Sequence, residues 1–91
     1  EIMIAFIGDR AKHYALNLVQ YLRHNHVRAI VDTQERNLKG QMKYSNKVGV
    51  KYSIVIGDDE IESGELTLKN METGEQTKIV KEEILDKIRR G

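Results

Sequence analysis

The stretch from Arg36 to Glu60, RNLKGQMKYSNKVGVKYSIVIGDDE, has a basic half, an apolar run and an acidic end. No acidic residue occurs between Arg36 and Gly57, and the apolar run 52–56 (YSIVI) stops at Gly57. At 100° per residue, one helical stripe holds Arg36, Lys39, Lys43 and Lys47, and the opposite stripe holds Leu38, Met42, Ser45 and Val48. The pattern predicts a basic helix, a buried strand and an acidic loop, as expected beside a polyanion-binding site.

The residues before this stretch predict two more strands and a helix. Residues 2–7 (IMIAFI) are continuously apolar up to Gly8, which is typical of a strand buried on both faces. Apolar residues recur at helical spacing over 11–24, and Asp9 is a candidate N-cap for that helix. The β-branched character of residues 27–31 indicates the second strand.

The residues after the acidic end have the pattern of a hairpin followed by a helix. Residues 65–69 alternate polar and apolar, residues 72–75 (ETGE) suit a tight turn, and residues 76–79 return as a strand. Apolar residues at helical spacing over 80–88 predict a closing helix. The predicted fold class is α/β with three layers: a mixed five-stranded sheet, made of three parallel strands plus an antiparallel hairpin, with three helices.

Composition excludes several classes of protein. The chain has no Cys, so disulfide frameworks, zinc–thiolate sites and thiol catalysis are excluded. Its longest apolar run is six residues, too short for a membrane span or a secretory leader. The net charge of +1 conceals segregated charge, because residues 58–75 hold seven acids and one Lys. We expect residues 1–91 to be a single domain, excised from a longer protein because the chain lacks an initiator Met.

Ligands of open α/β sheets gather at the carboxyl ends of the strands, where connections diverge. If the first strand lies between the second and third, residues 8–10 (GDR) and 57–60 (GDDE) wall that crevice, and residues 33–36 open onto it. Gly8 and Gly57 permit close backbone approach, and the adjoining helix starts offer N–H donors. The alternative reading is structural, since glycines at strand ends often only form turns and basic helix faces are often only solvated.

The sequence contains no complete catalytic motif. None of the three histidines has metal-ligand spacing with a carboxylate motif, and no P-loop or nucleophile elbow is present. Asp9, Asp32 and Asp58 each follow a predicted strand, as in a phospho-acceptor receiver domain, but the paired acids and the distal Lys of that fold are missing. Helix capping explains these aspartates better. The sequence therefore predicts a binding domain with no catalytic residue and no metal site.

Two segments carry a resemblance to a known family. Residues 32–52 read DTQERNLKGQMKYSNKVGVKY, and residues 54–70 (IVIGDDEIESGELTLKN) contain a G-x-x-E-x-x-x-G turn into a strand that ends in Lys. Together they resemble the C-terminal anticodon-binding domain of class II aminoacyl-tRNA synthetases, over nearly the whole chain. Residues 38–44 (LKGQMKY) and 49–52 (GVKY) are most similar to the histidyl branch. Threonyl, prolyl and glycyl members usually carry a Pro before that Tyr, and this chain has none.

The resemblance implies that an anticodon loop rests on the sheet edge and neighbouring loops. The residues expected at this RNA site are Gly8, Asp9, Arg10, Thr33, Glu35, Arg36, Lys39, Lys43, Gly57 and Glu60. Arg10 and Glu60 are expected beside unstacked bases, in a pocket also lined by residues 33, 35 and 36, while Lys39 and Lys43 are expected to contact phosphates. Aromatic residues are sparse, so stacking would have to come from Arg10, Arg36 or a Tyr.

The function implied is recognition of the tRNA-His anticodon, which positions the tRNA for ATP-dependent histidine attachment by a catalytic domain absent from this chain. The parent protein implied is a cytoplasmic, homodimeric histidine–tRNA ligase that uses ATP and Mg, with no cofactor in this domain and no membrane partner. One alternative is a paralogous domain, or a threonyl, prolyl or glycyl member, used for regulation or protein interaction. The basic stripe argues against such a repurposed domain. A second alternative is a small enzyme or phospho-carrier that uses His13 or Asp58.

Overall fold

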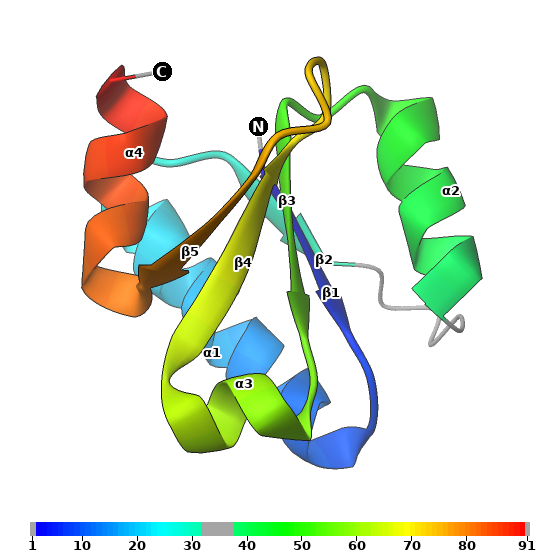
Figure 1. Ribbon diagram of the computed structural model, residues 1–91, viewed down its shortest axis with the longest axis vertical. Helices are drawn as coiled ribbons and strands as arrows, with labels where there is room; N and C mark the ends of the chain where they lie inside the picture. The colour runs from blue at the N-terminus through cyan, green and yellow to red at the C-terminus, as the bar shows by residue number, and fades with distance from the viewer. Residues whose placement is uncertain (1, 32–37, 91) are drawn as a thin grey trace.

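The protein is described by a computed structural model that covers residues 2–31 and 38–90, and its centre is a five-stranded sheet in the order β2-β1-β3-β4-β5 (Figure 1). The strands are β1 (Ile2–Phe6), β2 (Ala29–Val31), β3 (Tyr52–Ile56), β4 (Glu65–Asn70) and β5 (Gln76–Val80). β1 pairs in parallel with β2 and β3, and the β3–β4 and β4–β5 pairs are antiparallel. The predicted mixed sheet is confirmed, and the first strand lies between the second and third, which is the condition for the predicted crevice.

Helices cover both faces of this sheet. They are α1 (Asp9–His24), α2 (Leu38–Val48), α3 (Asp58–Ser63), the short 3-10 helix η1 (Lys81–Glu83) and α4 (Ile84–Arg90). α1 and α4 lie on one side of the sheet, α2 lies on the other, and α3 lies at the end where β1 and β3 finish (Figure 1). The three predicted layers are therefore present.

The main core lies between the sheet and the α1 and α4 side. Every residue of β1 is buried, as its continuous apolar run predicts for a strand covered on both faces. Ile4 and Ile54 lie side by side in the sheet, and together with Leu18 and Leu22 of α1 they belong to one buried cluster. Burial of each such side chain contributes about 1.5–3 kcal/mol, so this layer holds α1 firmly on the sheet.

Two local predictions are wrong. The acidic segment forms the helix α3 instead of a loop. Asp9 is the first residue of α1 and makes no capping bond, since the N-cap position belongs to Gly8. Val48, on the side of α2 opposite the lysine stripe, is the last residue of that helix and is 49% exposed. Ser45 on the same side is buried, while the side chains of Leu38 and Met42 lie outside the described part.

Tyr14 reports on the packing of α1 near η1. Its phenol pKa is raised above the ordinary value of 10.0, first by burial and second by the carboxylate of Glu82. Because the folded-state pKa is the higher one, the associated stability is present below the ordinary pKa and is lost as pH rises through the folded-state pKa. We expect Glu82→Gln to lower the pKa of Tyr14 only partly, since burial is the larger cause. NMR titration of the tyrosine ring carbons measures this, with Glu72→Gln in the distant hairpin as control; an unchanged Tyr14 pKa in Glu82→Gln contradicts the contribution of Glu82.

Candidate nucleic-acid interface

The candidate site lies at the sheet edge where β1 and β3 end. The backbone N–H of Ile7 donates to the carbonyl of Ile56 at 2.9 Å, so the two strands stay together up to the glycines that follow them. The chain then enters α1 after Gly8 and α3 after Gly57. Segments 8–10 and 57–60 therefore meet at one edge, as the sequence predicts from strand order.

Arg10, in the first turn of α1, lies within ion-pair distance of two acidic side chains of α3. Its Nη1 lies 3.9 Å from Oδ1 of Asp58 and 3.9 Å from Oε1 of Glu62. All three side chains are more than half exposed, and the distances are long, so each pair contributes little to stability. The guanidinium is consequently held toward α3 but can turn to a ligand at low energetic cost.

Gly8 supplies a backbone conformation that other residues rarely adopt. Its φ is +91°, and no atom lies within 4 Å of the position that a Cβ would occupy. The positive φ requires glycine, and the empty Cβ position leaves open space beside the backbone. A ligand can therefore approach this turn closely, as predicted.

Glu60 has a structural contact that the sequence prediction did not include. Its Oε1 accepts a hydrogen bond from the backbone N–H of Gly57 at 2.7 Å, which closes the first turn of α3. The same oxygen lies 3.1 Å from the Cβ position of residue 57. The N–H of Gly57 is therefore already occupied by the carboxylate of Glu60.

Gln41 fastens α2 to the end of β1. Its side chain is 1% exposed, and its amide makes two bonds of 2.8 Å: Nε2 donates to the carbonyl of Phe6, and Oε1 accepts from the N–H of Phe6. The described part of β2 pairs with β1 as far as Ile4 and Val31, and the amide bonds the backbone of Phe6, two residues farther along β1. The beginning of the basic helix therefore lies beside the turn that leads to Arg10.

Sequence reasoning gave Gln41 no site role. The available signal was its spacing of four residues from Ser45, which places both on one face of α2. Both are buried, so a polar stripe, and not a purely apolar one, faces the sheet.

The basic stripe of α2 faces solvent. Lys39, Lys43 and Lys47 are exposed and repeat every four residues along the helix, as predicted. Three predicted site residues, Thr33, Glu35 and Arg36, lie outside the described residues. The described part of the edge thus combines exposed lysines, an adaptable arginine and a glycine turn, which together suit an extended anionic ligand with polar edges.

Within 2–31 and 38–90, no helix is long and apolar enough to cross a membrane. Over the same residues, no three His, Asp or Glu side chains are grouped so as to hold a metal ion.

Comparison with known proteins identifies the family. A family profile described as "Anticodon binding domain" matches residues 1–91. The histidine–tRNA ligase of Acetivibrio thermocellus is 49% identical over 98% of this chain, and that of Staphylococcus aureus is 44% identical over 87%. These matches cover 21% and 19% of the two relatives, so the chain spans about a fifth of their length.

Solved structures agree with the sequence relatives. The apo histidyl-tRNA synthetase of S. aureus aligns over 96% of this chain and 25% of its own, with a TM-score of 0.90 and 40% identity. The RNA-binding domain of Cryptosporidium parvum threonyl-tRNA synthetase has a TM-score of 0.89 over 99% of this chain and 23% of its own, but its 18% identity shows the shared fold alone. The relatives do not favour the threonyl, prolyl or glycyl branch or a regulatory paralogue. The chain belongs to the anticodon-binding domain family, and within it to the branch found in histidyl-tRNA synthetases.

Proposed function

We propose that this domain binds the anticodon loop of tRNA-His and positions the tRNA for histidine attachment by a separate catalytic domain. The observation that carries the proposal is the placement of the exposed lysines of α2 at the same edge as the turn before Arg10, fixed by the two bonds between Gln41 and Phe6. The parent protein would be a cytoplasmic, homodimeric enzyme that uses ATP and Mg, with this domain as its C-terminal part. The domain itself would bind RNA without a cofactor.

Two groups of residues would divide the work of recognition. Lys39 and Lys43 would hold backbone phosphates, because an exposed lysine row follows an anionic strand without regard to its sequence. Arg10 and Glu60 would lie beside unstacked bases, whose edges offer donors and acceptors to such side chains. Thr33, Glu35 and Arg36 would line the same pocket.

A binding titration tests the proposal directly. The 91-residue chain is titrated with the tRNA-His anticodon stem-loop and, in parallel, with a stem-loop of the same stem and a scrambled anticodon. We expect tighter binding of the first, because base edges are read in addition to phosphates. Equal affinity for both RNAs contradicts anticodon recognition.

The base-reading role predicts a loss of discrimination. We expect Arg10→Ala and Glu60→Gln each to reduce the preference for the correct anticodon by about 1–3 kcal/mol, the usual value of one well-paired base contact. Gln is chosen at residue 60 because its side-chain oxygen can still accept from Gly57, so the first turn of α3 stays closed. Affinities for the correct and scrambled stem-loops measure the effect.

The matched control for Glu60→Gln is Asp59→Asn, which removes one negative charge from an exposed position of the same helix. If Asp59→Asn and Glu60→Gln change the discrimination equally, the effect arises from the charge of α3 and the assignment of Glu60 is wrong.

A further inference from the structure

Arg10 and Glu62 both lie at positions that helix stability does not favour. Arg10 is the second residue of α1, where a cation faces the positive end of the helix dipole. Glu62 lies in the last turn of α3, where an anion faces the negative end of that dipole. The helix that carries each charge therefore does not explain why the charge is there.

These two charges lie close to each other. Nη1 of Arg10 is 3.9 Å from Oε1 of Glu62, and the same nitrogen is 3.9 Å from Oδ1 of Asp58. Asp58 and Glu62 are four residues apart, so they share one face of α3, and that face is turned toward Arg10. One guanidinium thus has two carboxylates as neighbours at the edge where β1 and β3 end.

The surroundings of Arg10 carry more negative than positive charge. Asp9 precedes it, and α3 adds four carboxylates and no cation over 58–63. Arg10, Asp58 and Glu62 have side chains that are 60%, 67% and 69% exposed, so all three can reach a ligand. A phosphate that approaches the guanidinium meets these carboxylates as well and is repelled. A base edge is neutral and offers both donors and acceptors, so it can bond the guanidinium and a carboxylate together.

The lysines of α2 have different surroundings. Lys39 and Lys43 are exposed, and the sequence has no acidic residue from Arg36 to Gly57. No neighbour in the sequence offsets their charge, which suits contact with phosphates. The candidate site therefore contains two kinds of cation, one with neighbouring carboxylates and one without.

We propose that Asp58 and Glu62 are specificity-determining residues, which hold the guanidinium of Arg10 for a base edge and prevent phosphates from binding it. The inference rests on the proposed RNA-binding function. It adds to that function the two carboxylates, which act through Arg10 and on the approaching phosphate. Without them, Arg10 becomes one more phosphate contact, and RNA of any sequence binds more tightly.

Neutralising both carboxylates tests the proposal. The variant that combines Asp58→Asn with Glu62→Gln keeps the size of both exposed side chains and removes their charge. We expect it to bind the scrambled-anticodon stem-loop about two- to fivefold more tightly, because Arg10 gains a phosphate contact. The dependence of log K on log salt is expected to become steeper by roughly 0.7. Fluorescence anisotropy with the 91-residue chain measures both, and no change in either quantity overturns the proposal.

A second double variant controls for the loss of negative charge. Asp59→Asn combined with Glu65→Gln also removes two charges, from exposed positions on α3 and at the start of β4. Among the described residues, the ion pairs of Arg10 are with Asp58 and Glu62 and not with these two. We expect the control to change the affinity for the scrambled stem-loop less. An equal gain in the control overturns the proposal.

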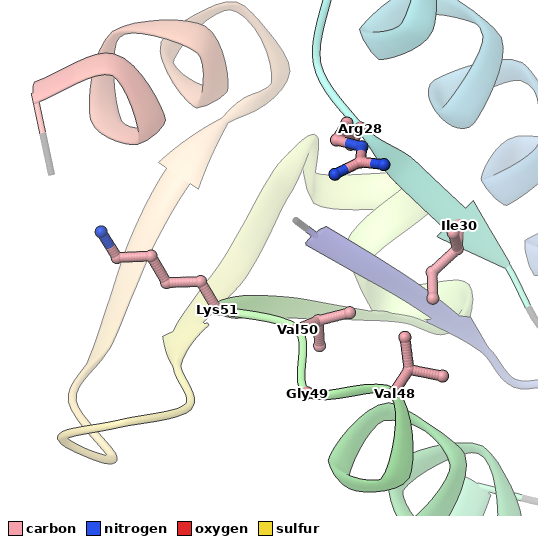
Figure 2. A pocket seen from close by; sticks show the side chains of 6 residues that line it. All are labelled: Arg28, Ile30, Val48, Gly49, Val50 and Lys51. Atoms are coloured by element: carbon pink, nitrogen blue, oxygen red, sulfur yellow. The ribbon is translucent and has the colours of Figure 1, made fainter.

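Making the neutralising changes in two further backgrounds shows whether Arg10 carries the effect. We expect the gain in affinity to disappear in Arg10→Ala and to persist in Arg28→Ala, since a double-mutant cycle isolates coupling between neighbours. Arg28 is an exposed arginine at the other end of the sheet, beside a hollow of about 340 Å³ at the start of β2 (Figure 2). A gain that persists in Arg10→Ala overturns the proposal, because the carboxylates then repel RNA without acting through Arg10.

The unchanged protein separates this inference from anticodon recognition. Equal binding of the correct and scrambled stem-loops by the unchanged protein contradicts anticodon recognition, whereas the present test uses the scrambled stem-loop alone. If the unchanged protein prefers the correct anticodon but the neutralised variant behaves like its control, the role of Asp58 and Glu62 is wrong and anticodon recognition stands.

Discussion

Replacing Gln41 with Ala is expected to lower the free energy of unfolding by about 2–5 kcal/mol. The substitution leaves the N–H and the carbonyl of Phe6 without their partner in a buried position, and each unsatisfied group costs about 1–3 kcal/mol. Few single changes in a domain of this size have an effect as large. Urea denaturation followed by circular dichroism measures it.

Two further variants separate the hydrogen bonds from the space that the side chain fills. Gln41→Met keeps most of the volume and removes both bonds, so we expect it to retain most of the destabilisation. Asn46→Ala, at an exposed position of the same helix, is expected to change stability by no more than about 0.5 kcal/mol. If Gln41→Met is as stable as the unchanged protein, packing and not hydrogen bonding explains the role of Gln41.

Replacing Lys39 and Lys43 together with Ala is expected to weaken binding of the anticodon stem-loop by about 1–2 kcal/mol, or roughly 5- to 30-fold. The loss is expected to be equal for the correct and scrambled anticodons, because phosphate contacts do not distinguish bases. The dependence of log K on log salt is expected to become shallower by roughly 0.7 for each contact removed. Fluorescence anisotropy across a salt series measures both quantities.

The control for the lysine variant is Lys87→Ala. Lys87 is exposed on α4, on the side of the sheet that faces away from α2 (Figure 1). A change in net charge alone affects all three positions alike, so a salt dependence that falls equally in Lys87→Ala contradicts the phosphate role of Lys39 and Lys43.

The sheet was predictable because its signals are local. The apolar run 2–7, the glycine after it and the turn at 72–75 each specify their own segment, and the alternation of strands and helices requires parallel strands joined by crossovers. The acidic helix α3 was not predictable in this way. It has only six residues, and its first turn is closed by the bond between Glu60 and Gly57, which local periodicity does not reveal.

The candidate site likewise has features that the sequence predicts and features that it does not. The exposure of Lys39 and Lys43 follows from helical spacing alone. The burial of Gln41 does not, because it depends on the packing of α2 against the distant end of β1. The described pairing of β2 with β1 reaches Ile4, and a side chain from α2 satisfies the N–H and the carbonyl of Phe6 two residues farther on.

The amide of Gln41 also has a consequence for the energetics of RNA binding. Apolar contact between a helix and a sheet is non-directional and permits small rotations, whereas two hydrogen bonds to one residue define the register of α2 along β1. The spacing between Lys43 and the turn before Arg10 is therefore set before any ligand arrives. Such preorganisation means that the entropy lost on association falls mainly on the RNA loop and not on the protein.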